Sequence, residues 1–463
     1  MIFNSLQFLV FFMIITISYY LIKNQKNRIW LLLLSSCYFY MVFVPTYILI
    51  LGFTIIIDYF AGILIAGSTA KNRKRWLIVS IIANVGILVF YKYFNFLLSS
   101  IEPLFLYLIP HYKLPYLNIL LPIGLSFHTF QAMSYTIEVY RGKQAPEKNF
   151  TIYALYVMYY PQLVAGPIER PQNMIHQFHE YKKYNWDNIK EGLARMAWGF
   201  FKKVVIADRI SMIVDYAFYN QPILSSWSLF VSALFYSFQI YCDFSGYSDI
   251  AIGASKVMGI NLMENFNEPY KSLNITEFWT RWHISLSTWF RDYVYIPLGG
   301  NRLGEKRRKL NVFIVFLLSG LWHGANWTFV IWGALHGILV TLFPGRKKKT
   351  YTNNSILKIL LLVINFILVT FCWVFFRANS IQSALNYLAG IFNFNKGQTK
   401  FGLNFAEILV SILFITIMIF RENKIKSFLI TNDKKFGLYL LTLIFICYFF
   451  GVFGENQFIY FQF

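Results

Sequence analysis

Charged side chains are scarce in this sequence, since only 14% of its 463 residues are Asp, Glu, Lys or Arg. Hydrophobic residues make up 57% of the chain, and many stand in runs long enough to cross a bilayer as helices. This composition excludes an ordinary soluble globular protein. We predict an all-α, polytopic integral membrane protein, a single domain over residues 1–463, with about 10–12 spanning helices plus re-entrant and interfacial helices.

Cysteine is also rare, and its placement argues against a disulfide framework or a thiolate metal site. The four cysteines each lie singly in an apolar segment, with no paired spacing: Cys37, Cys242, Cys372 and Cys447. No carboxylate or cysteine stands at ligand spacing from a histidine, so we expect no bound metal. G-x-S-x-G, H-E-x-x-H, P-loop and G-x-G-x-x-G motifs are absent, which leaves hydrolase, zinc-protease and nucleotide-binding functions without their usual local support.

Acidic residues are half as numerous as basic ones, 21 against 42, which gives a formal net charge of +21. The basic residues cluster in short loops between apolar runs, the pattern that keeps such loops in the cytoplasm. Membrane topology thus accounts for the charge, and we expect no nucleic-acid partner.

What the sequence does contain is a dense stretch from Glu277 to His336, with six of the twelve tryptophans and three of the seven histidines. An aromatic belt at the bilayer surface would account for the tryptophans. His323 is different because an apolar run surrounds it, and an ionisable side chain at membrane depth points to function.

The two basic runs that flank His323 predict a helical hairpin. Lys306–Lys309 and Arg346–Lys349 are both expected in the cytoplasm, yet only about 36 residues separate them, roughly 54 Å of helix. The chain must therefore enter the membrane and return, which places His323 near the far part of the hairpin. Close approach of the backbones is expected at three glycines: Gly320, Gly324 and Gly333.

Histidines inside a membrane protein suit acyl transfer to an alcohol. A neutral imidazole removes the proton of a hydroxyl group as that group attacks an activated acyl carbon, and burial favours the neutral form. Among the other histidines, His128 and His336 are interpreted as hydrogen-bonded packing residues. His283, judged only from its tryptophan-rich surroundings, would also be interpreted as structural. The remaining three are expected in solvated stretches: His111, His176 and His179.

Two further features allow two interpretations each. Asp243 and Asp249 lie in an apolar span, where they either serve catalysis or pair with basic or backbone donors; pairing is favoured because buried charges are usually paired. The apolar spacing from Ile189 to Val204 predicts an amphipathic helix that lies in the cytoplasmic interface or packs on other protein segments.

Three segments resemble the signatures of the membrane-bound O-acyltransferase family: Phe278–Ser287, Arg291–Gly300 and Leu321–Ala325. Within that family the sequence is most similar to the bacterial branch that O-acetylates alginate and to those that modify peptidoglycan and teichoic acid. The likeness extends through Ala165–Pro171 and Asp243–Asp249 to the C-terminal Phe458–Phe463, with the core signatures within residues 160–340.

The resemblance implies a helical funnel through a thinned membrane, in which His323 is catalytic and His283 occupies the second active-site position. His323 would act as general base or accept the acyl group itself, and His283 would orient the reacting atoms. We expect the neighbouring aromatic and amide side chains to contact substrate: Trp279, Trp282, Trp322 and Asn326.

The resemblance further implies a multi-pass protein of the bacterial cytoplasmic membrane with no bound cofactor. An acyl thioester, acetyl-CoA, would donate from the cytoplasm, where Lys and Arg attract its phosphates. A separate extracytoplasmic partner with an SGNH, serine-esterase-like fold would pass the acetyl group to a polysaccharide. Two alternatives stay open: transfer of D-alanyl or another acyl group to teichoic acid or peptidoglycan, and a transporter or flippase whose histidines relay protons.

Overall fold

A computed structural model describes residues 1–109, 113–119, 121–122, 124–163, 166–343, 354–394, 396–422 and 432–453. These residues form helices with short connections, and the only β interaction in the described ranges is an isolated bridge between Leu224 and Gln398. The all-α prediction is therefore confirmed. Four predicted features lie outside the described residues: His111, Ala165, Arg346–Lys349 and Phe458–Phe463.

Contacts between residues group the chain into two compact units, Met1–Gly192 with Ala251–Met263, and Leu193–Ile250 with Glu264 onward. The single-domain assignment stays a prediction. The helices of the first unit are α1 (Leu6–Leu21), α2 (Gln25–Met41), α3 (Ile48–Gly67), α4 (Ala70–Leu88), α5 (Phe94–Leu108), α6 (Leu125–Tyr140), α7 (Phe150–Met158), α8 (Tyr160–Leu163) and α9 (Pro171–His179).

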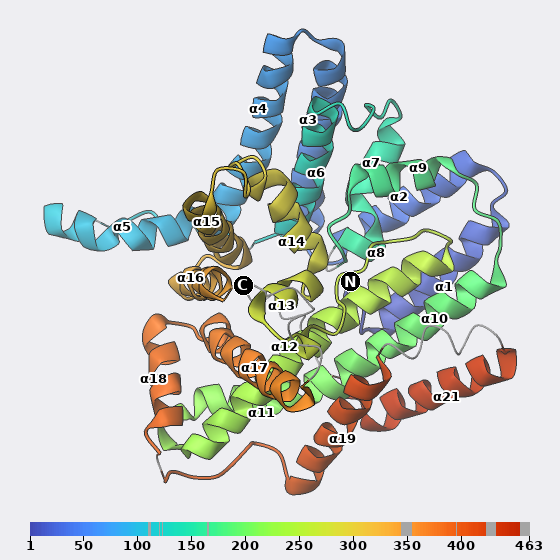
Figure 1. The fold of residues 1–463 in the computed structure, drawn as a ribbon. Helices are drawn as coiled ribbons and strands as arrows, with labels where there is room; N and C mark the ends of the chain where they lie inside the picture. Colours follow the sequence, from blue (N-terminus) through green and yellow to red (C-terminus); the bar gives the residue numbers. More distant parts are fainter. Residues whose placement is uncertain are drawn as a thin grey trace. The chain divides into compact units, whose positions relative to one another are not determined.

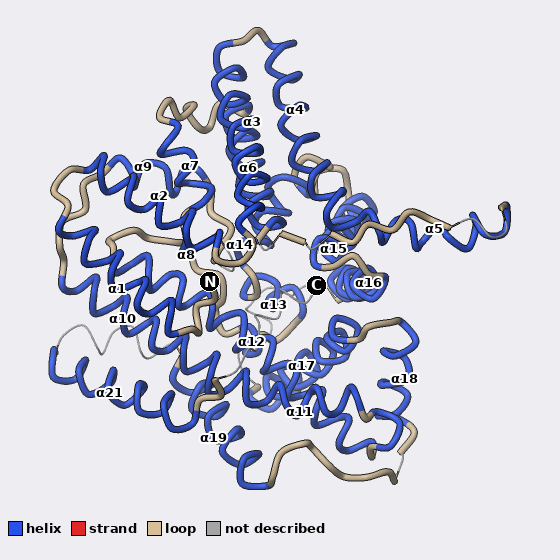
Figure 2. The backbone as a smooth tube through the Cα atoms, turned by 180° about the vertical axis from the view of Figure 1, so that it is seen from behind, coloured by secondary structure: helices blue, strands red, loops and turns tan. Residues whose placement is uncertain are grey.

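Helices α3, α4 and α6 pack against one another in the first unit, as the ribbon and the tube views both show (Figures 1 and 2). Their contact holds a buried polar cluster around Asp58 of α3, which accepts hydrogen bonds from Ser80 Oγ at 2.6 Å and Asn84 Nδ2 at 2.8 Å. Thr136 of α6 joins through its hydroxyl, 2.9 Å from Ser80 Oγ. Buried polar groups need such partners, so the cluster ties the three helices together.

The second unit holds the candidate site. Helices α10 (Trp186–Phe200) and α12 (Ser226–Val257) contribute to both units, and the others of the second are α11 (Asp208–Tyr219), α13 (Ile275–Arg281), α14 (Ile284–Phe290), α15 (Glu305–His323), α16 (Trp327–Leu342), α17 (Ser355–Arg377), α18 (Ile381–Phe392), α19 (Phe405–Arg421) and α21 (Asp433–Phe450).

Helices α15 and α16 form the predicted hairpin, joined by the short turn at residues 324–326 (Figure 1). Glycines let the two backbones meet: a Cβ on Gly320 would lie 2.3 Å from the carbonyl oxygen of Phe329. A Cβ on Gly333 would lie 2.3 Å from that of Phe316. The expectation of close backbone approach is confirmed for Gly320 and Gly333, whereas a Cβ on Gly324 would meet the side chain of Phe329.

Three helical segments of the described residues are long and apolar enough to cross a membrane: Pro45–Gly67, Ala70–Leu108 and Ser355–Arg377. Two apolar helices, α1 and α16, are shorter. Apolar side chains are exposed along these helices, as expected where lipid is the solvent. The number of crossings stays a prediction.

The amphipathic segment predicted from Ile189 forms most of α10, which packs on protein segments. Within the second unit, a Cβ on Gly199 would lie 2.6 Å from the carbonyl oxygen of Gly246 on α12. Ala194 of α10 also packs against Phe436 of α21. Of the two interpretations, packing against other helices is the one that the structure supports.

Candidate active site

His323 is the last residue of α15 and lies among aromatic rings. The helix ends there because Gly324 adopts an extended conformation, with φ −157° and ψ 149°. The imidazole is 3% exposed, and three rings meet it edge-on at centroid distances of 5.0, 5.1 and 5.3 Å: Trp322, Trp332 and Phe376. Contact with these three rings shields the imidazole from water.

His283 immediately precedes α14 and has an unusual backbone conformation. Its φ of 43° and ψ of 55° lie in the left-handed region, which non-glycine residues rarely adopt and which often marks a functional position. The side chain is fully buried, and its Nδ1 lies 3.1 Å from Asn265 Oδ1. Phe244 of α12 packs edge-on against the ring at a centroid distance of 4.6 Å.

The fold brings the two predicted catalytic histidines together. The ring centroids of His283 and His323 are 6.3 Å apart, although 40 positions separate them along the chain. Trp322 lies beside both, with centroid distances of 6.1 Å to His283 and 5.0 Å to His323. At this spacing one small reacting group placed between the rings would lie within contact distance of both.

The remaining predicted site residues do not all face this pair. Trp279 Nε1 donates to His336 Nδ1 at 3.3 Å. Trp282 stacks on Phe278 at 5.5 Å and is 1% exposed. Trp322 contacts both catalytic candidates.

Asn326 caps the start of α16. Its Oδ1 accepts from Thr328 N at 3.0 Å, and its Nδ2 donates to the backbone oxygen of Asn379 at 3.0 Å. Both polar groups of this amide are therefore engaged in holding the hairpin turn. Its predicted contact with substrate, like that of the three tryptophans, stays a prediction.

The packing interpretation fits His336 and His128. His336 is fully buried and accepts the hydrogen bond from Trp279 described above. His128 Nδ1 lies 3.2 Å from the carbonyl oxygen of Gly124, the residue before its own helix α6. His176 and His179 are exposed on α9, as predicted, and His179 Nε2 also lies 2.7 Å from Glu147 Oε2.

A cavity of about 390 Å³ is lined by residues of α13, α14, α15 and α16. Most of its lining is apolar, and Trp279 and Arg291 contribute to it. Its walls reach Ser319, one helical turn before His323, and Ser287, one turn after His283, while neither histidine itself lines it. Small-molecule sites occupy about 300–1,000 Å³, so this space suits part of a substrate.

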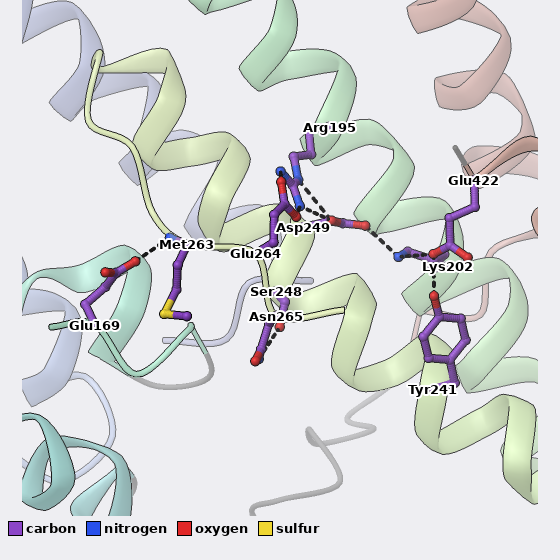
Figure 3. A network of polar contacts seen from close by, with 10 residues as sticks. All are labelled: Glu169, Arg195, Lys202, Tyr241, Ser248, Asp249, Met263, Glu264, Asn265 and Glu422. Carbon is purple, nitrogen blue, oxygen red and sulfur yellow. Dashed lines mark hydrogen bonds and ion pairs between the residues drawn. The ribbon is translucent and has the colours of Figure 1, made fainter. Parts of the chain in front are cut away.

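The two carboxylates of the polar α12 segment are paired with basic side chains. Asp243 accepts from Lys203 Nζ at 2.6 Å, and Asp249 accepts from Arg195 Nε at 3.0 Å and from Lys202 Nζ at 2.5 Å. Figure 3 shows Lys202 between Asp249 and Glu422, whose carboxylate also accepts from a tyrosine hydroxyl. This pairing agrees with the favoured structural interpretation.

Figure 3 also shows two contacts that sequence reasoning missed. In the second unit, Asn265 donates through Nδ2 to Ser248 Oγ at 3.2 Å. In the first unit, the Glu169 carboxylate accepts the backbone N–H of Met263. Asn265 is a polar residue in an irregular segment, and no periodicity or spacing signal distinguishes it from a solvated loop residue.

Among the described residues, no set of three or more His, Cys, Asp or Glu side chains is arranged to hold a metal ion. The chemistry available at the pair is that of two imidazoles in an aromatic, water-poor environment: proton transfer, nucleophilic attack and hydrogen bonding.

Comparisons with known proteins agree with the sequence resemblance. The model of the membrane-bound O-acyltransferase family matches residues 148–385. The chain is 40% identical to a probable alginate O-acetylase, AlgI, of Pseudomonas aeruginosa, covering 86% of this chain and 76% of the relative. It is 38% identical to a peptidoglycan O-acetyltransferase of Helicobacter pylori (80% and 74% covered) and 30% identical to a teichoic acid D-alanyltransferase of Bacillus subtilis (67% and 80%).

Proposed function

The chain belongs to the membrane-bound O-acyltransferase family, and from this premise we propose that it moves an acetyl group from a cytoplasmic thioester toward the hydroxyls of an extracytoplasmic polysaccharide. Membership makes the protein a membrane-bound O-acyltransferase. A transporter or flippase is therefore no longer proposed. The acetyl group, its donor, the acceptor and the bacterial cytoplasmic membrane with several passes are the parts that we propose.

The observation that carries the proposal is the meeting of His283 and His323, with ring centroids 6.3 Å apart at the tip of the hairpin. Ester formation needs a group that takes the hydroxyl proton and a group that holds the acyl carbon near the attacking oxygen. Two buried imidazoles at this distance supply both, and the cavity ending one turn from each admits an apolar chain.

Acetyl-CoA is the proposed donor because of the charge at the start of α15. Its first turns carry Lys306, Arg307 and Lys309, whose side chains are exposed. Exposed cations attract the phosphates of a nucleotide-bearing thioester and raise its local concentration. The thioester arm would then extend along the α15–α16 hairpin toward His323.

A polysaccharide is the proposed acceptor because relatives of this chain are named for alginate and peptidoglycan O-acetylation. We propose that an extracytoplasmic partner with an SGNH-type fold receives the acetyl group and passes it to the polymer. D-alanyl transfer is the second candidate, since the teichoic acid D-alanyltransferase relative is also matched over 67% of this chain.

The direct test replaces His323 with alanine and measures acetyl esters on the secreted polymer, together with thiol release from acetyl-CoA by the purified protein. A loss of about 10²- to 10⁴-fold is expected whether the imidazole takes the hydroxyl proton or holds the acyl carbon near the attacking oxygen. His176→Ala is the matched control, because that histidine is exposed on α9 and should leave turnover unchanged.

The second arm of this test compares donors. Thiol release from acetyl-CoA in detergent, without an ion gradient, supports the proposed donor. Release from a D-alanyl carrier-protein thioester, with none from acetyl-CoA, would transfer the proposal to the D-alanyl branch. Unchanged acetylation in the His323→Ala protein would remove the proposed mechanism altogether.

A further inference from the structure

The side-chain amide of Asn265 contacts both the His283 ring and the first turn of α14. Its Oδ1 lies 3.1 Å from His283 Nδ1, 3.3 Å from Ser285 N and 2.9 Å from Ser285 Oγ. Its Nδ2 donates to Ser248 Oγ on α12 at 3.2 Å. Asn265 and Ser285 are fully buried, so these contacts form without competition from water.

The contact with Ser285 N determines which way the amide points. A backbone N–H can only donate, so the Asn265 atom that faces it must be the oxygen and not the nitrogen. That same oxygen faces His283 Nδ1 and can only accept. The proton of a neutral His283 must therefore sit on Nδ1, and its lone pair on Nε2.

The backbone around His283 is held by the same residue. Ile284 N donates to the main-chain oxygen of Asn265 at 2.9 Å, immediately after the left-handed His283. A strained conformation persists only where neighbours over-determine it, and strain of this kind gathers at functional positions. Asn265 thus sets both the ring tautomer and the backbone angle from which the ring projects.

We propose that Asn265 is a positioning residue that fixes the Nδ1–H tautomer of His283, so that Nε2 takes the proton of the acceptor hydroxyl; this rests on the acyl transfer proposed above. The hydroxyl O–H bond breaks, the oxygen bonds to the acyl carbon and the C–S bond of the thioester breaks. The proton passes from His283 Nε2 to the departing thiolate, which leaves as a thiol. In this step His323 positions the acyl group of the thioester and forms no bond to it.

The groups that surround His283 do not supply a competing base among the described side chains, because the carboxylates nearby are paired. The charged or titratable side chains on the elements around it include Asp243 and Asp249 on α12, Glu264 beside Asn265, Glu277 and Arg281 on α13, and His323 on α15. Each of these five charged side chains takes part in an ion pair.

Two substitutions at Asn265 separate positioning from simple packing. Asn265→Leu keeps the branched shape of the side chain but removes the acceptor, so kcat for thiol release from acetyl-CoA should fall by about 10²- to 10⁴-fold with KM little changed. Asn265→Asp keeps an acceptor for Nδ1–H and for Ser285 N, so most activity should remain. Its carboxylate stabilises the imidazolium, so the acid limb of the pH–rate profile should move upward by about one pH unit or more.

If Asn265 had only a packing role, the expected result for Asn265→Asp would differ. Asn265→Asp would then keep both the activity and an unmoved acid limb, and that result would overturn the proposal. Ser248→Ala is the matched control, because it removes a contact on the far side of the amide while Ser285 N still orients the oxygen. Its acid limb should stay at the wild-type pH.

Direct measurement of the tautomer does not depend on any variant folding. In the full-length protein with ¹⁵N-labelled histidine, the His283 signals, assigned by their loss in His283→Gln, should show a protonated Nδ1 and a lone pair on Nε2. The opposite tautomer would overturn the proposal. Failure of the proposed acyl transfer looks different: thioester turnover would persist in His323→Ala and His283→Ala while the tautomer remained as stated.

Discussion

The close crossing of α15 and α16 makes a sharp prediction at Gly320. This glycine lies three positions before His323, and a Cβ there would come within 2.3 Å of the Phe329 carbonyl oxygen. Ordinary contact begins at 3.4 Å, so the added methyl group is about 1 Å too close. The obstructing atom belongs to the backbone, so a side-chain rotation cannot relieve the clash. Gly320→Ala must push the helices apart next to the catalytic candidate.

The size of the effect follows from two opposing terms. Overpacking of this kind costs about 1–3 kcal/mol, while alanine in a helix interior gains roughly 0.5–1 kcal/mol over glycine. Gly320→Ala should therefore lower the free energy of unfolding by about 1–2 kcal/mol. Displacing His323 by about 1 Å should reduce turnover by roughly 10²-fold, because proton transfer and acyl attack depend on sub-ångström placement.

The assay pairs thermal unfolding in detergent with thiol release from acetyl-CoA. Gly437→Ala is the matched control, since this helical glycine of α21 has no heavy atom within 4 Å of the added Cβ. It should be slightly stabilised, by about 0.5–1 kcal/mol, and fully active. Wild-type stability and turnover in Gly320→Ala, with the control behaving as expected, would refute the claim that the glycine crossing holds His323 in place.

Two further substitutions test the polar contacts of the second unit. Lys202→Met leaves Asp249 with one cationic partner fewer. Because the lysine side chain is 2% exposed, the free energy of unfolding, measured by chemical denaturation, should fall by about 3 kcal/mol. Arg377→Met, which breaks the more exposed ion pair with Asp215, should lower it by under about 1 kcal/mol. Trp279→Phe removes the donor to His336 Nδ1, so the free energy of unfolding should fall by about 1–3 kcal/mol. The tryptophan fluorescence that comes from this position should disappear.

Features that depend on neighbouring residues along the chain were predictable. The hairpin followed from basic runs at its ends and the length between them, and His323 was expected near its tip, where α15 ends. The glycines of the crossing were recognisable because only a residue without Cβ permits such an approach. The family followed from the motifs around His283 and His323, and the comparisons confirm it.

The tertiary structure alone decided how the chemistry-bearing side chains meet. The sequence by itself determined a helical membrane protein, its hairpin and the two histidines worth testing, because hydropathy, charge and motif spacing are properties of consecutive residues. It did not determine that His283 and His323 lie 6.3 Å apart, or that Asn265 orients the His283 ring. Those contacts join segments 18 to 40 positions apart. They depend on the path of irregular loops and on a left-handed turn at His283, which no local periodicity specifies.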